Sequence, residues 1–229
     1  MLKTPHGGLI KLRQNQTMKT FLPAYLQCAV LCCLMAALSS TSASAQAQLW
    51  GGQPELGIGF ERETSADKSL VTHSVTLMPG LSFKNGAVNR IELLINTERD
   101  IDSSSGTDTY SNVHGLAIRA RKDVALAEHL GMYFHGLLGR SQSDSSRFWY
   151  GYSDAALLVE YGFFDFMWGV RIQRALDETT DQGFNKLRLG PGFNLTDKHR
   201  IEVNWVRSWQ AESHALDSDS VVLEYTFKF

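Results

Sequence analysis

The feature that most constrains this chain is a period-two alternation of apolar and polar residues that recurs after residue 50. The stretch SVVLEYTFKF (220–229) shows it clearly, with apolar residues at every second position from Val221 to Phe229. That spacing is the period of a β-strand with one apolar face and one mostly polar face. Because an unpaired apolar edge strand promotes aggregation, this stretch must pair with strands elsewhere in the chain.

Ten segments carry this alternation, and we predict a strand in each. They are 54–63, 71–83, 89–98, 112–121, 130–140, 153–163, 166–176, 185–195, 199–209 and 220–229. Short turns, such as the one with the Asn85-Gly86 pair, join some neighbours, and longer polar loops rich in Ser, Asp and Thr join the others. An even strand number with short turns at one end is typical of membrane barrels whose termini lie on the turn side. We therefore predict an all-β fold, a closed antiparallel up-and-down transmembrane β-barrel of about ten strands.

The N-terminal region has a different pattern. Lys19 precedes an apolar run over 21–38, and small residues in A-x-A register follow within 43–47. This order is typical of a secretory signal peptide, with an uncleaved transmembrane anchor as the alternative. We expect 1–47 to be an N-terminal extension with a cleaved signal peptide and 48–229 to be the barrel.

Composition and the positions of the cysteines limit the kinds of protein that the chain can be. Cys28, Cys32 and Cys33 all lie in the leader, so we expect the mature chain to hold no disulfide. The formal net charge of −2 gives no reason to expect a nucleic-acid partner. A charged fraction of 20% is ordinary for a soluble protein, but a membrane barrel has it too, because only half of each strand is apolar.

The C-terminal strand also carries a family resemblance. VVLEYTFKF, ending on an aromatic residue, resembles the assembly signal of bacterial outer-membrane β-barrel proteins. The resemblance implies that the barrel-assembly machinery reads Tyr225, Phe227 and Phe229. It also implies residence in a Gram-negative outer membrane, with lipid and lipopolysaccharide as the other partners.

A weaker resemblance concerns transport. In size, leader and C-terminal strand, the chain is similar to the small monomeric oligogalacturonate-specific porins, which line their lumen with basic residues suited to acidic sugars. Its mature length suits ten strands rather than the twelve of that family. The resemblance implies transport and identifies no substrate.

Alternation sorts the side chains into a lipid-facing set and a lumen-facing set. The expected pore-lining residues are Arg90, Glu92, Arg119, Arg121, Glu160, Arg171, Lys186, Arg188, Arg200, Glu202 and Glu224, and Glu61, Glu98 and Lys228 share their face. The basic members gather in the fourth and the seventh to ninth segments, with few acids between them, as expected of a basic wall along an anion-conducting lumen. Glycines on the same face either widen the lumen or relieve strand curvature. They are Gly57, Gly59, Gly115, Gly169, Gly190 and Gly192.

Two interiors fit this pattern. Barrels of about eight strands are filled by side chains, whereas those of 16–18 strands leave an aqueous channel. We predict a narrow porin-like channel for passive diffusion of small hydrophilic solutes, anionic solutes and oligosaccharides among them. The alternative is a non-conducting structural or adhesive barrel with a plugged, salt-bridged interior.

Catalysis is a third possibility. Barrel proteases of the omptin type also have ten strands, with Asp and His residues at the outer rim. The residues that could play that part are His73, His114 and His214 with Asp102, Asp108 and Asp217. They do not match the omptin pairs residue by residue, and Ser74 beside His73 is too common a dipeptide to indicate a lipid A deacylase. We expect no enzyme activity, no cofactor and no metal, since no cluster has ligand spacing.

Aromatic residues fit interfacial girdles. The exception is RFWYGY (147–152), which we expect to form an aromatic cluster in a long loop. It would serve as part of the interfacial belt, as a sugar-stacking or adhesive surface, or as a constriction if the loop folds inward.

Overall fold

The computed structural model describes residues 51–84, 87–143, 146–177 and 183–229. The predicted leader, its three cysteines and the Asn85-Gly86 pair lie outside the described residues. Among the described residues, no helix is long and apolar enough to cross a membrane.

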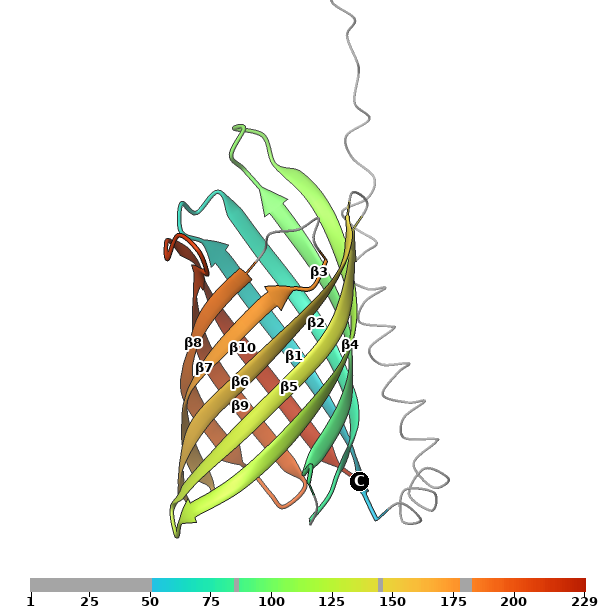
Figure 1. Cartoon of the computed structure of the whole chain (residues 1–229), viewed down its shortest axis with the longest axis vertical. Coiled ribbons are helices and arrows are strands. Elements are labelled where there is room, and N and C mark those ends of the chain that lie inside the picture. Colours follow the sequence, from blue (N-terminus) through green and yellow to red (C-terminus); the bar gives the residue numbers. More distant parts are fainter. Residues whose placement is uncertain (1–50, 85–86, 144–145, 178–182) are drawn as a thin grey trace, which may run out of the picture. The chain divides into compact units, whose positions relative to one another are not determined.

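Antiparallel strands form a closed barrel in which each strand pairs with its sequence neighbours and the first pairs with the last (Figure 1). The strands are β1 (Gln53–Ser65), β2 (Leu70–Ser82), β3 (Arg90–Asp102), β4 (Thr109–Ala127), β5 (Leu130–Ser143), β6 (Arg147–Tyr161), β7 (Phe164–Ala175), β8 (Gly183–Asn194), β9 (His199–Gln210) and β10 (Leu216–Lys228). The predicted fold class and the ten strands are confirmed.

The seam between β1 and β10 explains why the alternation runs to the C-terminus. Phe60 lies opposite Leu223 in this pairing. The Phe229 N–H donates to the Pro54 carbonyl at 3.1 Å, and the Gln53 side-chain amide donates to the Phe229 carbonyl at 3.2 Å. The final strand is therefore paired on both sides, and no open edge remains there.

The two ends of the barrel differ less than the sequence suggested. The C-terminus lies at the lower end in Figure 1, which we call the turn end and which carries the connections 83–89, 128–129, 162–163 and 195–198. The opposite end, which we call the loop end, carries the connections 66–69, 103–108, 144–146, 176–182 and 211–215.

The prediction of long polar loops is wrong where strands continue into them. β5 reaches Ser143 and β6 begins at Arg147, so the aromatic stretch 147–152 lies in a strand. β4 likewise continues to Ala127, beyond the predicted segment 112–121. Since about 9–11 residues suffice for a tilted strand to cross a bilayer, these strands extend into water, where polar residues can stay in the ladder.

The outer surface of the barrel is apolar. Large hydrophobic side chains that point outward and are exposed include Phe60, Ile91, Ile95, Leu116, Ile118, Leu138, Trp168, Val170, Ile172 and Val221. The inward positions between them are buried and mostly polar or small. A closed sheet with an apolar exterior and a polar interior is the arrangement that a membrane barrel requires.

Candidate functional site: the barrel interior

The predicted lumen residues lie on the inward faces of their strands, as the alternation requires. Glu160 differs from the others because it is exposed at the turn-end rim of β6. The remaining residues fall into three ion-pair groups and one open cavity, which together define the interior.

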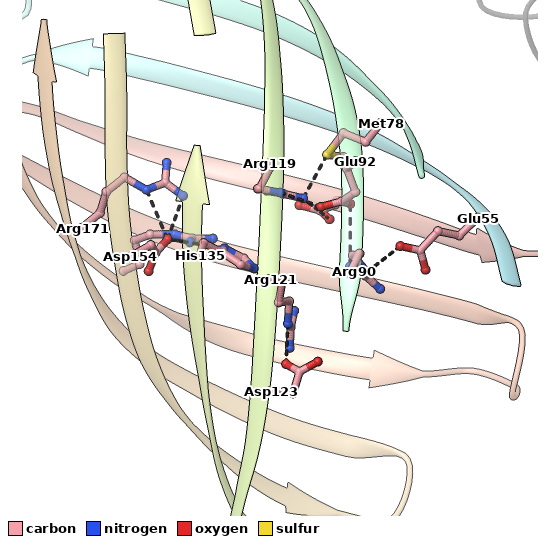
Figure 2. Close-up of polar contacts among 12 residues, drawn as sticks. Glu55, Met78, Arg90, Glu92, Arg119, Arg121, Asp123, His135, Asp154 and Arg171 are labelled. Carbon is pink, nitrogen blue, oxygen red and sulfur yellow. Dashed lines mark hydrogen bonds and ion pairs between the residues drawn. The ribbon is translucent and has the colours of Figure 1, made fainter. Parts of the chain in front are cut away.

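The first group of ion pairs joins residues of β1, β3, β4 and β10. Figure 2 shows its members Glu55, Arg90, Glu92 and Arg119. Arg90 Nε lies 2.5 Å from a Glu55 carboxylate oxygen, and the Arg90 guanidinium lies 3.8 Å from Glu92. Arg119 donates from Nε to Glu92 at 2.6 Å and lies 3.8 Å from Glu224. Arg119 is only 6% exposed, so neighbouring side chains shield most of its side chain from water.

The second group is centred on Asp154 of β6. Arg171 donates two hydrogen bonds to one carboxylate oxygen, at 2.9 and 3.2 Å, and Arg188 donates to the same oxygen. His135 lies 3.8 Å from this oxygen, and the Arg171 guanidinium sits 3.9 Å above the Tyr152 ring. Asp154 is 3% exposed and therefore serves as a buried acceptor for two cations.

The third group lies toward the turn end. Arg200 makes a two-point contact with Asp165, at 2.5 and 2.8 Å, and donates to Glu202 at 2.6 Å. A Cβ atom at Gly192 would lie 2.5 Å from both Asp165 and Arg200, so no larger residue fits there unless these side chains shift. This glycine makes room for an ion pair and does not widen a channel.

These ion pairs show that the prediction of a basic wall with few acids is wrong. The arginines of the interior each have a carboxylate within ion-pair distance, and they are Arg90, Arg119, Arg121, Arg171, Arg188 and Arg200. The prediction of few acids missed Glu55, Asp123, Asp154 and Asp165. The signal was available, because the phase that puts Glu160 on the inward side also puts Asp154 there.

A cavity of about 280 Å³ occupies the loop-end half of the interior. Its lining includes Glu61, Glu98, Tyr150, Arg171 and Lys186, and the buried Arg119 and Arg188 close it toward the centre. In the turn-end half the described residues leave a void of about 10 Å³ beside Arg121, Arg200 and Asn204, room for about one water molecule. Among the described residues, the larger cavity of the interior therefore lies toward the loop end, and the packing beside Arg121, Arg200 and Asn204 is tight.

Side chains of the aromatic stretch 147–152 alternate between the outer face of the barrel and its interior. Trp149 points outward and is 45% exposed, whereas Phe148, Tyr150 and Tyr152 line the cavity. The prediction of an aromatic cluster in a loop is therefore wrong, and the inward-facing side chains of this stretch form an aromatic wall of the cavity.

The structure places the three predicted rim histidines outside the barrel interior. His73 and His114 are exposed on the outer face, and His214 lies in the connection 211–215. Within the described residues, none of the three hydrogen bonds to Asp102, Asp108 or Asp217, and no group of three His, Cys, Asp or Glu side chains is placed to hold a metal.

The predicted assembly-signal residues gather at the turn end. The Tyr225 hydroxyl lies 2.6 Å from His199 Nδ1, and the Phe227 ring packs 4.9 Å from the rings of both His199 and Phe229. Recognition of these residues by the barrel-assembly machinery stays a prediction.

Comparison with known proteins shows which solved structures share this architecture. No family model and no curated protein matches the sequence. Among solved structures, the beta domain of the Bordetella autotransporter BrkA matches 78% of this chain and 100% of its own, with 11% identity and a TM-score of 0.51. An outer membrane channel from Pseudomonas putida F1 matches 77% of this chain and 96% of its own, with 11% identity and a TM-score of 0.50.

The chain has the fold of the bacterial outer-membrane β-barrels. A closed barrel with an apolar exterior resides in a membrane, so the predicted outer-membrane location holds. The KdgM porin in complex with disordered oligogalacturonate also matches, covering 76% of this chain and 99% of its own, but at 9% identity and a TM-score of 0.38 the likeness carries no argument about transport.

Proposed function

We propose that the protein is an outer-membrane barrel closed at its centre by a salt-bridged plug, with a hydrophilic cup open toward the loop end. Of the two interiors that the sequence allowed, this is the non-conducting one. The observation that carries the proposal is the burial of the ion pairs of Arg119 and Asp154 in mid-lumen.

Burial and pairing both argue against a conducting centre. Side chains that line a water-filled pore are exposed to that water, whereas Arg119 and Asp154 are 6% and 3% exposed. A paired arginine also presents little net charge to a passing anion, so the field that would select anions is largely cancelled. Opening the centre would also require water to replace the contacts that these buried charges now make with each other.

A narrow channel for small hydrophilic solutes, anionic ones or oligosaccharides included, is the second candidate. The observation in its favour is the 280 Å³ cavity, which already occupies the loop-end half of the path and carries Lys186 on its wall. Conduction would require the pairs of Arg119 and Asp154 to separate.

Planar-bilayer recording separates the two. The wild-type barrel is expected to show no conductance steps. A variant with alanine at Glu92, Arg119, Asp154 and Arg188 is expected to conduct, since it removes charge and side-chain volume from both buried groups of the plug. The matched control removes the exposed pair Arg207 and Asp219 and is expected to stay silent. Steady steps from the folded wild-type protein, checked by heat-modifiable migration, would establish the channel instead.

A further inference from the structure

The loop-end cavity contains a set of acceptors that no cation among the described residues satisfies. Glu61 and Glu98 lie on either side of Ser74 on one rung of the barrel, since Ser74 is the register partner of both. All three residues line the cavity. This arrangement places two carboxylates and a hydroxyl on one inward patch of β1, β2 and β3.

The hydrogen bonding of this patch is incomplete. Glu61 accepts from the Ser220 hydroxyl at 2.6 Å, and Glu98 accepts from the Asn96 amide at 2.5 Å. Ser74 is 8% exposed, and within the described residues its hydroxyl has no hydrogen-bond partner. Since a carboxylate offers about four acceptor positions and buried polar groups are normally paired, each member has unused capacity.

The carboxylates of this patch differ from those of the plug because they have no cationic partner among the described residues. The arginines of the plug all have carboxylate partners, whereas Glu61 and Glu98 have no cation within ion-pair distance among the described residues. Lys186 also lines the cavity and makes no ion pair in the described part of the chain. Tyr152 lines it as well; this residue is only 8% exposed, and its hydroxyl has no hydrogen-bond partner among the described residues.

We propose that this cavity binds the primary ammonium group of a small hydrophilic solute that enters from the loop end. An ammonium group has three donors, and Glu61, Ser74 and Glu98 supply three acceptors. Lys186 is the group that would meet a carboxylate or hydroxyl at the other end of such a solute. At about 280 Å³ the cavity is close to the lower end of small-molecule sites, which suits a solute of amino-acid size. The site does not depend on whether the plug opens.

Three probes with one chain length test the proposal: 1,5-diaminopentane, 5-aminopentanoate and pentanedioate. Each is titrated by calorimetry into the folded barrel in a non-ionic detergent at low ionic strength. Both amines are expected to bind with a Kd of about 1 mM or below. Pentanedioate is expected to give no heat above dilution, because its carboxylates would face Glu61 and Glu98.

Variants then assign the site. Glu98→Gln and Glu61→Gln are each expected to weaken amine binding about tenfold, because each removes a charged acceptor. Ser74→Ala should weaken it about threefold. Lys186→Met should weaken 5-aminopentanoate and leave 1,5-diaminopentane as tight or tighter. The matched control is Glu160→Gln, which removes an exposed carboxylate at the turn end and should change neither amine.

The result that overturns the proposal is also concrete. Equal binding of pentanedioate, amine binding that the Glu61 and Glu98 variants leave within about twofold of wild type, or no amine heat up to about ten times the expected Kd would each refute it. Heat-modifiable migration of every variant shows that the barrel is folded, so a lost signal reports the site and not misfolding.

Discussion

Asp154→Asn is the sharpest test of the plug. Asp154 is a buried acceptor for Arg171 and Arg188, and its side chain is 0% exposed. The asparagine keeps the shape and removes the negative charge, so two cations lose their counter-charge at once. A fold that depends on this pair should lose much of its stability, whereas a water-filled lumen would hydrate the arginines and lose little.

The structure sets the size of the effect. Removing one partner of a buried ion pair costs about 3–5 kcal/mol. Two arginines are affected, but both border the loop-end cavity, where water can reach them, so the expected loss stays at about 3–5 kcal/mol and does not double. The matched control is Asp219→Asn, the same change in the exposed pair with Arg207, which should have a much smaller effect.

Urea-induced unfolding in lipid vesicles, followed by tryptophan fluorescence, measures both variants. Adding Arg171→Met and Arg188→Met to Asp154→Asn should recover part of the loss, because no unpaired charge then remains buried. If Asp154→Asn proves no more costly than Asp219→Asn, the centre of the barrel is hydrated and the plug does not exist as described.

Two further predictions concern the ends of the barrel. Deleting Phe229 removes its hydrogen bond to β1 and should lower the amount of heat-modifiable protein in the outer membrane; an unchanged amount in membrane fractions would refute its role in assembly. In the connection 66–69, hydrogen bonds from the Ser65 hydroxyl and from Ser69 lower the pKa of Asp67 to about 2, so they stabilise this loop above about pH 4 and are lost as the pH falls through about 2. Amide exchange of the loop against pH checks this, with Asp67→Asn as the variant that should show no such transition.

Strand number and the inward or outward orientation of side chains could be predicted because they are local. Alternation fixes which side of a strand each residue faces, and it placed Arg119 and Arg188 correctly without any tertiary information. Strand ends were harder to predict. Serine and aspartate near the rims predict loops, yet a strand ladder that extends into water accommodates these residues, as in β5 and β6.

The pairing of charges could not be predicted from the sequence alone. Arg171 lies directly opposite Asp154 in the β6–β7 register, but Arg188 reaches the same carboxylate from β8, two strands away. Such a contact depends on strand tilt and stagger, which follow from closure of the whole barrel. The prediction of few acids beside the arginines was wrong for this reason: the alternation places the arginines on the inward face, but it does not show which carboxylates they meet.

The β1–β10 seam has a consequence for how the protein folds. It joins the two strands that lie farthest apart along the chain, so it is the contact with the greatest loop-closure cost and the natural slow step. Until it forms, the sheet has two open edges, and the Arg119–Glu224 contact between β4 and β10 is missing. Lipid tolerates neither open edges nor unpaired charge. Insertion and closure should therefore occur as one cooperative event, and chains that stall before closure would be left to periplasmic proteases.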